Sequence, residues 1–488
     1  MFFYLAETQP GRGRVVGPSI QGMPDPRPST LLILGASGDL AARLLMPGLG
    51  MLLAHEPKRR VQLIGSGVED LTDAEWKKRV KSSFDSEGAK GPAVTATLKN
   101  TKYIKADVTA KADLEGLLAA CDNPPALYFA LPPAITEKAC AQLAKIELPD
   151  KTSLALEKPF GTDERSAKRL NTLLLTIVPE SRIHRVDHFL GRSTVLNLLG
   201  LRFANRLIEP MLSNRDVESI EIVYDEQLAL ENRARYYDHA GALVDMIQSH
   251  LLQVMAVLVM EAPATLRAED VRDQKQLALR ATHLWNDDPS TSRRARYSAG
   301  SVAGRKLPAY KNEDGVDPAL GTETLAEVVV EVRNMRWAGV PILMRSGKAL
   351  ASHRREIIVT FKAPSHVPPE FKTLKTADRL RICIAPDEMS LELNVNGPGD
   401  PYVIDRATLK ADFNPGDLPA YGEVLQGILD GDATLSVRGD AAVEGWRIVA
   451  PVLKAWKSGT VPLDEYPAGS NGPKSWPTGA AEATPAKR

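Results

Sequence analysis

A short strand that runs directly into a glycine-bracketed turn constrains this chain more than any other feature of its sequence. Leu31–Leu34 is an apolar run, Gly35-Ala36-Ser37-Gly38 follows it, and a helical pattern continues from Gly38 to about His55. Glycines at such a turn let the backbone approach a pyrophosphate, and the following helix offers unbonded N–H groups at its N-terminus. The pattern predicts the first unit of a dinucleotide-binding domain, although GxxG spacing alone is also typical of a tight strand–helix turn.

Apolar strands alternate with helical segments over the first part of the chain. Strands are predicted at residues 61–64, 126–131 and 154–156, and a helix at 73–85 with Asp73 as its N-cap. This alternation is typical of a parallel sheet with helical crossovers.

The pattern changes after about residue 185. Half-buried strands are predicted at 219–224, 324–333, 340–345 and 355–362, and helices at 240–260, 420–430 and 440–456. Such a series of strands favours a large, mostly antiparallel sheet. We therefore predict a flexible N-terminal extension (1–29), an α/β Rossmann-type dinucleotide-binding domain (30–185), an α+β substrate-binding and oligomerisation domain (186–466) and a disordered tail (467–488).

Composition excludes several classes of protein. Lys and Arg number 61 and Asp and Glu also number 61, so the chain lacks the basic surplus of a nucleic-acid-binding protein. No run of about 18 continuous apolar residues indicates a membrane span, and the apolar start lacks the features of a signal peptide. The three cysteines are scattered and the eight histidines have no metal-ligand spacing, which indicates a reducing cytoplasm and no metal.

The end of the second strand bears on the cofactor. In Rossmann domains this end meets the adenosine ribose, where an acidic residue favours a free 2′-hydroxyl and an arginine favours a 2′-phosphate. Here Glu69 and Asp70 follow the strand and no arginine does. The residues alone favour NAD as the cofactor. The alternative interpretation is that both acids are solvated loop residues.

Three further segments carry a family resemblance. They are Glu157-Lys158-Pro159-Phe160-Gly161, Arg185-Val186-Asp187-His188-Phe189-Leu190-Gly191-Arg192, and the run Asp245–Gln253 with His250 inside it. Together with the glycine loop they resemble the glucose-6-phosphate dehydrogenase family. Similarity continues from Trp337 to Trp446, so it spans roughly residues 30–456 in order.

The resemblance implies oxidation of glucose 6-phosphate at C1 to 6-phosphoglucono-1,5-lactone, with hydride transfer to NADP or NAD. It makes His250 the base and Asp187 the group that orients it, where a lone histidine would more often be a satisfied core residue. It implies substrate contacts from Lys158, His188, Arg192, Glu226, Asp245, Lys348 and His353. It implies cofactor contacts from Gly35, Ser37, Gly38, Asp39, Leu40, Tyr128, Pro132 and Lys158, a cis peptide bond before Pro159, and a homodimer or homotetramer built through the large sheet.

The spacing of two of these residues sets a geometric expectation. Asp245 precedes His250 by five residues on the same predicted helix. In an α-helix five residues turn through about 500°, which leaves the two side chains about 140° apart. We therefore expect both to border a pocket without sharing one narrow face.

Departures from the family pattern gather around the 6-position of the sugar. Leu44 stands where a lysine is usual, Phe189 replaces a tyrosine, Arg192 a lysine and His353 a basic residue, and Ala385 replaces a glutamine. Arg192, Arg354 and Arg355 could compensate. The alternatives are a dehydrogenase of another C6-substituted aldopyranose and a non-catalytic nucleotide-binding homologue. Val68 occupies the place of the arginine for the 2′-phosphate, which leaves NAD or the use of both cofactors open.

Overall fold

The computed structural model describes residues 29–480 apart from residues 232–233, 373–376, 385, 413–415 and 478. The predicted flexible extension therefore lies outside the described residues except for Ser29. Ala385 and the end of the predicted tail, residues 481–488, also lie outside them.

Seven strands form the first sheet, in the order β18-β6-β5-β4-β1-β2-β3. All neighbours are parallel except β18 and β6. This order is that of a Rossmann sheet with one added antiparallel strand, which confirms the predicted fold class. The strands are β1 (Ser29–Leu34), β2 (Val61–Gly67), β3 (Lys102–Lys105), β4 (Pro125–Phe129), β5 (Ser153–Glu157), β6 (Ile183–Val186) and β18 (Ser436–Val437).

Helices cover both faces of this sheet because the side chains of β1 alternate between two cores. Leu31 and Ile33 pack into one apolar cluster, and Leu32 and Leu34 pack into the other. The helices are η1 (Ala41–Leu45), α1 (Met46–His55), α2 (Asp73–Ser86), α3 (Pro92–Asn100), α4 (Lys111–Ala119), α5 (Pro133–Leu143), α6 (Glu164–Leu175) and η2 (Glu180–Arg182).

One predicted helix cap is wrong. The N-cap of α2 is Thr72, whose hydroxyl accepts the N–H of Glu75 while the Glu75 carboxylate accepts the N–H of Thr72. This reciprocal capping box satisfies two helix-end donors, which a single Asp cap one residue later would not. Asp73 instead accepts the backbone N–H of Tyr103 at the start of β3.

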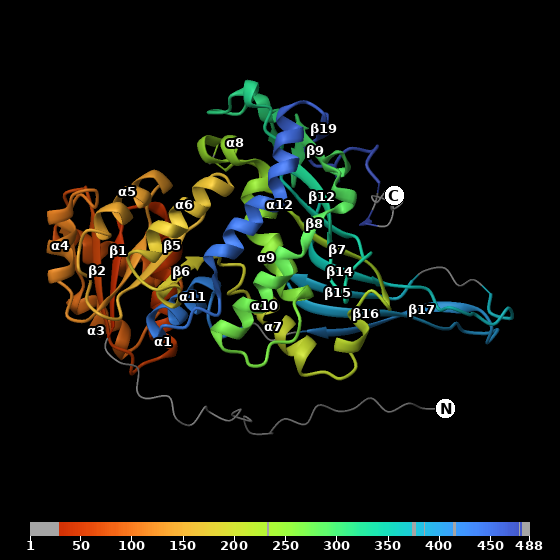
Figure 1. Cartoon of the computed structure of the whole chain (residues 1–488), viewed down its shortest axis with the longest axis horizontal. Helices are drawn as coiled ribbons and strands as arrows, with labels where there is room; N and C mark the ends of the chain where they lie inside the picture. Colours follow the sequence, from red (N-terminus) through yellow and green to blue (C-terminus); the bar gives the residue numbers. More distant parts are fainter. Residues whose placement is uncertain are drawn as a thin grey trace.

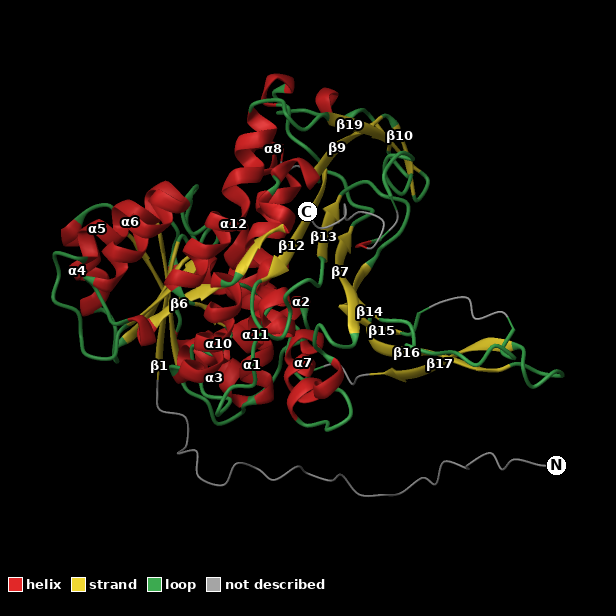
Figure 2. Ribbon diagram, turned by 45° about the vertical axis from the view of Figure 1, so that its right-hand side comes forward, coloured by secondary structure: helices red, strands yellow, loops and turns green. Residues whose placement is uncertain are grey.

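The second sheet has ten strands, in the order β17-β16-β15-β14-β7-β13-β12-β9-β19, with β8 also paired to β12. Its pairs are antiparallel except β7 with β13 and β9 with β19, so the predicted mostly antiparallel sheet is confirmed. Figure 2 shows β15, β16 and β17 extending as a long ribbon from the body. The strands are β7 (Val217–Asp225), β8 (Thr282–Leu284), β9 (Arg293–Ser298), β12 (Leu325–Val332), β13 (Ile342–Gly347), β14 (Arg355–Phe361), β15 (Arg379–Ile384), β16 (Asp387–Asn396), β17 (Ile404–Asp412) and β19 (Leu463–Pro467).

Helices fill the space between the two sheets (Figure 1). The most apolar of them, Tyr236–Val259, is long enough to cross a membrane, but 83% of its apolar window is buried inside the protein, as in a core helix. The remaining elements are α7 (Ser193–Phe203), η3 (Glu209–Met211), α8 (Ala234–Ala242), η4 (Leu243–Leu251), α9 (Leu252–Val259), α10 (Ala268–Arg280), η5 (Trp285–Asp287), η6 (Pro289–Thr291), a hairpin of β10 (Gly300–Val302) and β11 (Arg305–Leu307), η7 (Tyr310–Asn312), η8 (Pro318–Leu320), α11 (Ala420–Asp430) and α12 (Gly439–Lys457).

Late segments of the chain return to the first sheet. Strand β18 pairs with β6, and α11 packs on α1 so that Tyr421 and Leu425 join the core beneath β1. The part of the chain predicted as the second domain thus lends a helix and a strand to the first, and places Tyr421 near the carboxyl ends of its strands.

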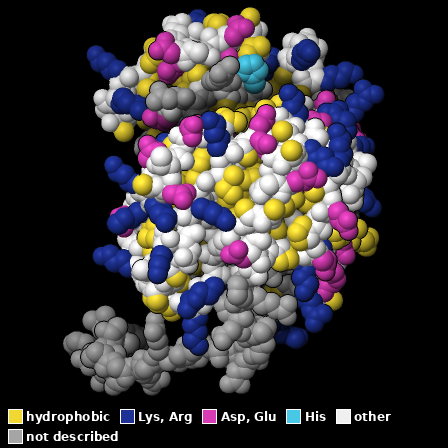
Figure 3. Space-filling model, turned by 90° about the vertical axis from the view of Figure 1, so that its left-hand side faces the viewer, with side chains coloured by type: hydrophobic (Ala, Val, Ile, Leu, Met, Phe, Trp, Pro, Cys, Tyr) yellow, Lys and Arg dark blue, Asp and Glu magenta, His cyan; other side chains and the backbone are white. Residues whose placement is uncertain are grey.

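The predicted disorder from residue 467 is wrong for residues 467–477, 479 and 480. Tyr466 and Ala480 are fully buried, and Trp476 is nearly so. The Trp476 indole N–H donates to Asp464 Oδ2 at 2.7 Å. A composition rich in Pro, Gly and Ser suggested disorder, yet two aromatic anchors supply enough buried surface to fix this segment. On the face in Figure 3, acidic and basic side chains are interspersed, in keeping with the absence of net charge.

Candidate active site

The glycine loop lies at the carboxyl end of β1, where the strand order reverses between β1 and β4. Gly35 has φ +84°, and a Cβ atom there would come within 2.3 Å of the Ala130 carbonyl oxygen that follows β4. Only glycine tolerates both conditions. The loop leads directly into the helix that starts at Asp39 and Leu40. This close-packed cradle at the switch point fits a dinucleotide pyrophosphate.

Besides the backbone hydrogen bonds from Gly35 and Ala36 to Ser66, a short side-chain hydrogen bond joins the glycine loop to the segment after β2. The Ser37 hydroxyl donates to Glu69 Oε2 at 2.6 Å, and this bond lowers the pKa of Glu69. Val68 is 67% exposed and carries no charge. Asp70 pairs with Lys105 across the neighbouring strand at 3.1 Å. The glycine loop thus meets a carboxylate, and Val68 places no positive charge at the end of β2.

A second cluster joins the ends of β4 and β5. The Tyr128 hydroxyl donates to Glu157 Oε1 at 2.5 Å, and the Tyr421 hydroxyl donates to the same oxygen at 3.3 Å. Burial raises the pKa of Glu157 to about 7 in spite of these bonds and of neighbouring Lys158. Tyr128 is fully buried, so it supports Glu157 and presents no surface to a cofactor. Pro132, predicted with it, caps α5 next to the glycine loop and stays partly exposed.

Lys158 connects the end of the first sheet to helix η4. Its peptide bond to Pro159 is cis. Its ammonium group donates to the backbone carbonyl of Asp245 at 2.8 Å and to Asp245 Oδ1 at 3.0 Å. Burial alone would raise the pKa of Asp245, but the charge of Lys158 holds it below its ordinary value. The end of the cofactor-side sheet is thus tied directly to helix η4.

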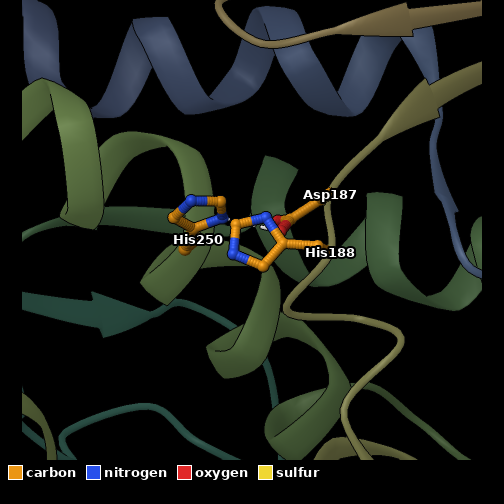
Figure 4. Close-up of side chains that lie close together, drawn as sticks. All are labelled: Asp187, His188 and His250. Carbon is orange, nitrogen blue, oxygen red and sulfur yellow. Dashed lines mark hydrogen bonds and ion pairs between the residues drawn. The ribbon is translucent and has the colours of Figure 1, made fainter. Parts of the chain in front are cut away.

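The centre of the site is a buried pair, Asp187 and His250 (Figure 4). His250 Nδ1 lies 2.6 Å from Asp187 Oδ1, which also accepts the N–H of Phe189 at 2.9 Å. Burial lowers the pKa of His250 below its ordinary value, against the charge of Asp187. Because Asp187 accepts a hydrogen bond from the Nδ1–H group of the neutral ring, the proton stays on Nδ1 and the lone pair of Nε2 remains available. A neutral, oriented imidazole with a free Nε2 is suited to act as a general base.

The helix that carries His250 corrects one sequence-based expectation. Residues 243–251 form a π-helix, in which hydrogen bonds run from i to i+5. Residues five apart then lie about one turn apart on the same face. Asp245 and His250, expected about 140° apart on an α-helix, therefore share a face of η4, and the charge of Asp245 acts on His250.

Two aromatic residues pack around the base. Phe189 lies nearly parallel to the His250 ring, with centroids 4.2 Å apart. His188 packs edge-on against His250 and stacks on Tyr421, and burial lowers the pKa of His188 to about 3. The ligand atoms of Asp187, His188 and His250 lie within 4.8 Å of one another. The hydrogen bond between Asp187 and His250 and the edge-on packing of His188 account for that proximity.

The predicted sugar ligands lie in a second lysine–carboxylate pair. Lys348 donates to Glu226 Oε2 at 2.7 Å, and its ammonium group lies 5.3 Å from the Tyr237 ring centroid. Polar side chains in two such pairs can exchange their mutual bonds for the hydroxyls of a sugar.

The predicted phosphate end contains two guanidinium groups around Tyr224. Arg192, the N-cap of α7, lies 4.6 Å from the Phe189 ring centroid and 5.9 Å from that of Tyr224. Arg355, which pairs with Tyr224 in the sheet register, lies 4.9 Å from the Tyr224 ring centroid. The Nε atoms of both arginines are buried without a hydrogen-bond partner in the described structure. His353, expected here, is exposed.

Strand alternation separates Arg355 from its neighbour. Arg354 turns to the other side of β14, where it pairs with Glu356 at 3.1 Å. Among the described residues, Glu226 is the carboxylate that comes within ion-pair distance of Arg355, at 3.8 Å. The sequence had grouped the two arginines as equal candidates, and had given Tyr224 no role. Tyr421 appeared only as part of a similar segment, because its contact with His188 depends on tertiary packing.

Comparisons with known proteins cover nearly the whole chain. Residues 32–197 match the family described as "Glucose-6-phosphate dehydrogenase, NAD binding domain", and residues 199–484 match "Glucose-6-phosphate dehydrogenase, C-terminal domain". The glucose-6-phosphate 1-dehydrogenase of Treponema pallidum is 35% identical over 486 residues, covering 93% of this chain and 94% of that protein. That of Gluconobacter oxydans is 35% identical over 92% of this chain and 95% of its own length.

Solved structures agree with the sequence comparisons. A glucose-6-phosphate dehydrogenase in complex with its substrate glucose 6-phosphate superposes with a TM-score of 0.82 at 29% identity, over 92% of this chain and 96% of that one. The enzyme from Mycobacterium avium superposes with a TM-score of 0.78 at 31% identity, over 92% of this chain and 95% of that one.

Proposed function

This chain belongs to the glucose-6-phosphate dehydrogenase family, and from that premise we propose how it oxidises glucose 6-phosphate at C1 to 6-phosphoglucono-1,5-lactone. The observation that carries the mechanism is the buried Asp187–His250 pair, in which Nδ1 is occupied and Nε2 is free.

His250 takes the proton of the C1 hydroxyl through Nε2. Asp187 fixes the tautomer and stabilises the imidazolium that forms, as the acid of a Ser-His-Asp triad does. As the O–H proton leaves, the C1–H bond breaks with its electron pair and the C1–O bond becomes a carbonyl. A bound nicotinamide dinucleotide supplies the hydride acceptor for this oxidation. Phe189, stacked on His250, keeps water from one face of the ring.

The substrate is held at both ends. Lys158 with Asp245, and Lys348 with Glu226, bind the ring hydroxyls close to the base. The 6-phosphate binds to Arg192 and Arg355, whose unbonded Nε–H groups flank Tyr224. Guanidinium forks match phosphate oxygens, so the two arginines compensate for the lost lysine and tyrosine and favour a phosphate over an uncharged group at C6. In this arrangement exposed His353 makes a secondary contribution or none.

The dinucleotide binds along the glycine loop. Gly35, Ser37 and Gly38 form the cradle, and the helix that begins at Asp39 and Leu40 directs N–H groups to the pyrophosphate. We propose residues 30–185 as the cofactor domain and residues 186–466 as the substrate domain, with α11 and β18 lent back to the former.

We further propose that the enzyme uses NAD at least as well as NADP. The Glu69 carboxylate beside Ser37 accepts a ribose 2′-hydroxyl and repels a 2′-phosphate. Exposed Val68 supplies no compensating charge, Lys105 is paired with Asp70, and Arg79 is the basic group whose charge acts on Glu69.

The assembly and location follow from the family and from the surface. We propose a homodimer or homotetramer built on the large sheet, whose outer strands β16 and β17 expose Val395 and Leu409 and whose connecting turn exposes Tyr402. Three free thiols fit a reducing cytoplasm. Light scattering on the purified protein measures the oligomer directly.

The first experiment is the initial rate of nicotinamide reduction with glucose 6-phosphate, run with NAD and with NADP. We expect a rate with both and the higher kcat/KM with NAD. The variant His250→Asn is the matched control, and we expect it to bind substrate without turning it over. A folded parent with no rate on either cofactor would overturn the proposal.

A further inference from the structure

A buried lysine lies near the Asp187–His250 pair and has no evident structural role. Lys275, on α10, is only 3% exposed. Within the described part of the chain, no hydrogen-bond acceptor or ion-pair partner contacts its ammonium group. A lysine residue this deeply buried is rare, because burial removes hydration from its charge.

One acceptor near this lysine is also unused. Asp187 Oδ1 receives both the His250 ring and the Phe189 N–H, but Oδ2 is buried and has no hydrogen-bond partner among the described residues. The charge of Asp187 acts on Lys275 and raises its pKa, while burial lowers it to about 8, so Lys275 still carries its proton at neutral pH.

The shared contact of Arg272 and Arg185 with Glu180 places this side of α10 beside the end of β6. Arg272 and Lys275 lie one turn apart on the same helix face, and Arg185 and Asp187 lie two residues apart along the strand direction. The first residues of these two pairs, Arg272 and Arg185, both donate to Glu180. The second residues, Lys275 and Asp187, come next along the helix and the strand, on the same side.

We propose that Lys275 is a positioning residue for the catalytic pair: its ammonium group holds Asp187 Oδ2 through a buried water, so that Oδ1 stays fixed on His250 Nδ1. The buried amides of Gln253 and Gln276 also have atoms without partners, which fits a hydrated polar seam between α9 and α10. The inference rests on the proposed function, since Lys275 acts only through the base.

We expect the charge of Lys275 to affect the pKa of His250 as well. The groups that face His250 are Asp187, Lys158, Asp245 and His188, and those that act on Lys275 are Asp187 and Arg272. Removing the positive charge of Lys275 makes the imidazolium easier to form, so the pKa of His250 should rise. Since only neutral His250 can accept the C1 proton, the acid limb of kcat/KM should move to higher pH.

The test compares Lys275→Met, Lys275→Arg and Arg272→Met with the parent holoenzyme. Arg272→Met is the matched control, because it removes a buried cation from the same helix face but breaks a contact with Glu180 instead. For each, kcat and KM are measured across the pH range at saturating cofactor, and the melting temperature is measured in parallel. His250→Asn is included so that loss of the base itself can be told apart from loss of Lys275.

For Lys275→Met we expect the acid limb of kcat/KM to move up by about half a unit to one unit, with kcat reduced about tenfold. Lys275→Arg should keep the parent profile, and Arg272→Met should lose thermal stability with an unchanged profile. A folded Lys275→Met enzyme with the parent's acid limb and kcat would overturn the proposal, even if His250→Asn is inactive. If Lys275→Met does not fold, Lys275→Gln replaces it under the same criteria.

Discussion

Replacing Arg355 by methionine should separate phosphate recognition from chemistry. The Arg355 guanidinium has a buried Nε–H without a partner and its nearest carboxylate, Glu226, is 3.8 Å away. The variant Arg355→Met therefore breaks no internal hydrogen bond, and its cost should appear only when the phosphate binds. A charge-assisted hydrogen bond is worth about 1.5–3 kcal/mol, and about 1.4 kcal/mol corresponds to a factor of ten. We expect KM for glucose 6-phosphate to rise about 10- to 100-fold with kcat little changed, because this contact is the same in ground and transition states.

The assay is steady-state initial rates with glucose 6-phosphate and with glucose, at saturating cofactor. Glucose lacks the phosphate, so its kinetics should not respond to the loss of Arg355. The matched control is Arg354→Met, one residue away on the opposite side of β14. Its side chain is 40% exposed and paired with Glu356, so we expect an unchanged KM and a stability loss of at most about 1 kcal/mol. An unchanged KM in Arg355→Met, or an equal rise for glucose, would refute the assignment.

Three further predictions use the same protein. His250→Asn should lower kcat by about 10²–10⁴, while substrate still raises the melting temperature; a variant with parental kcat would exclude His250 as the base. Burial raises the pKa of Glu157 to about 7, so the stability from this group is complete below about pH 4.5 and is lost as pH rises through 7. Glu157→Gln should therefore match the parent at acidic pH and exceed it at pH 8 by up to about 3 kcal/mol, measured by urea unfolding, and equal stability at both pH values would contradict this. Glu69→Gln should raise the ratio of kcat/KM for NADP to that for NAD about tenfold, and an unchanged ratio would remove Glu69 from the cofactor site.

The sequence was informative where local pattern and motif order decide the structure. The apolar run before Gly35 is β1, and the alternation after it produced the Rossmann strand order. The pairing of Asp187 with His250 was implied by family motifs, and the two are 2.6 Å apart. No propensity or periodicity argument could have joined residues 63 positions apart.

The rest depended on backbone geometry that composition does not encode. The π-helical form of η4 brings Asp245 and His250 to one face, while an α-helical reading separated them. Tyr421 reaches His188 only because α11 returns to the first sheet. Arg355, unlike Arg354, faces Tyr224 because of the register between β7 and β14. Each of these contacts follows from long-range pairing, which a single sequence leaves open.

The distribution of charge in the site explains how substitutions around the phosphate can be tolerated. Near the base, three acids each have a basic partner: Asp187 has His250, Asp245 has Lys158, and Glu226 has Lys348. Because His250 is neutral before substrate arrives, these three pairs carry no excess of positive charge.

The other end is not neutral. Arg192 has only the Tyr224 hydroxyl at 3.4 Å, and Arg355 has no carboxylate within hydrogen-bond distance among the described residues. Two guanidinium groups without a hydrogen-bonded carboxylate match a phosphate monoester, which carries a charge of about −1.5 to −2 at pH 7. An uncharged C6 group would leave both guanidinium groups half-buried and without a hydrogen-bonded anion, at a cost of about 1–3 kcal/mol for each. We therefore propose that Arg192 and Arg355 select for a phosphate, even though the lysine and tyrosine of the family pattern are absent.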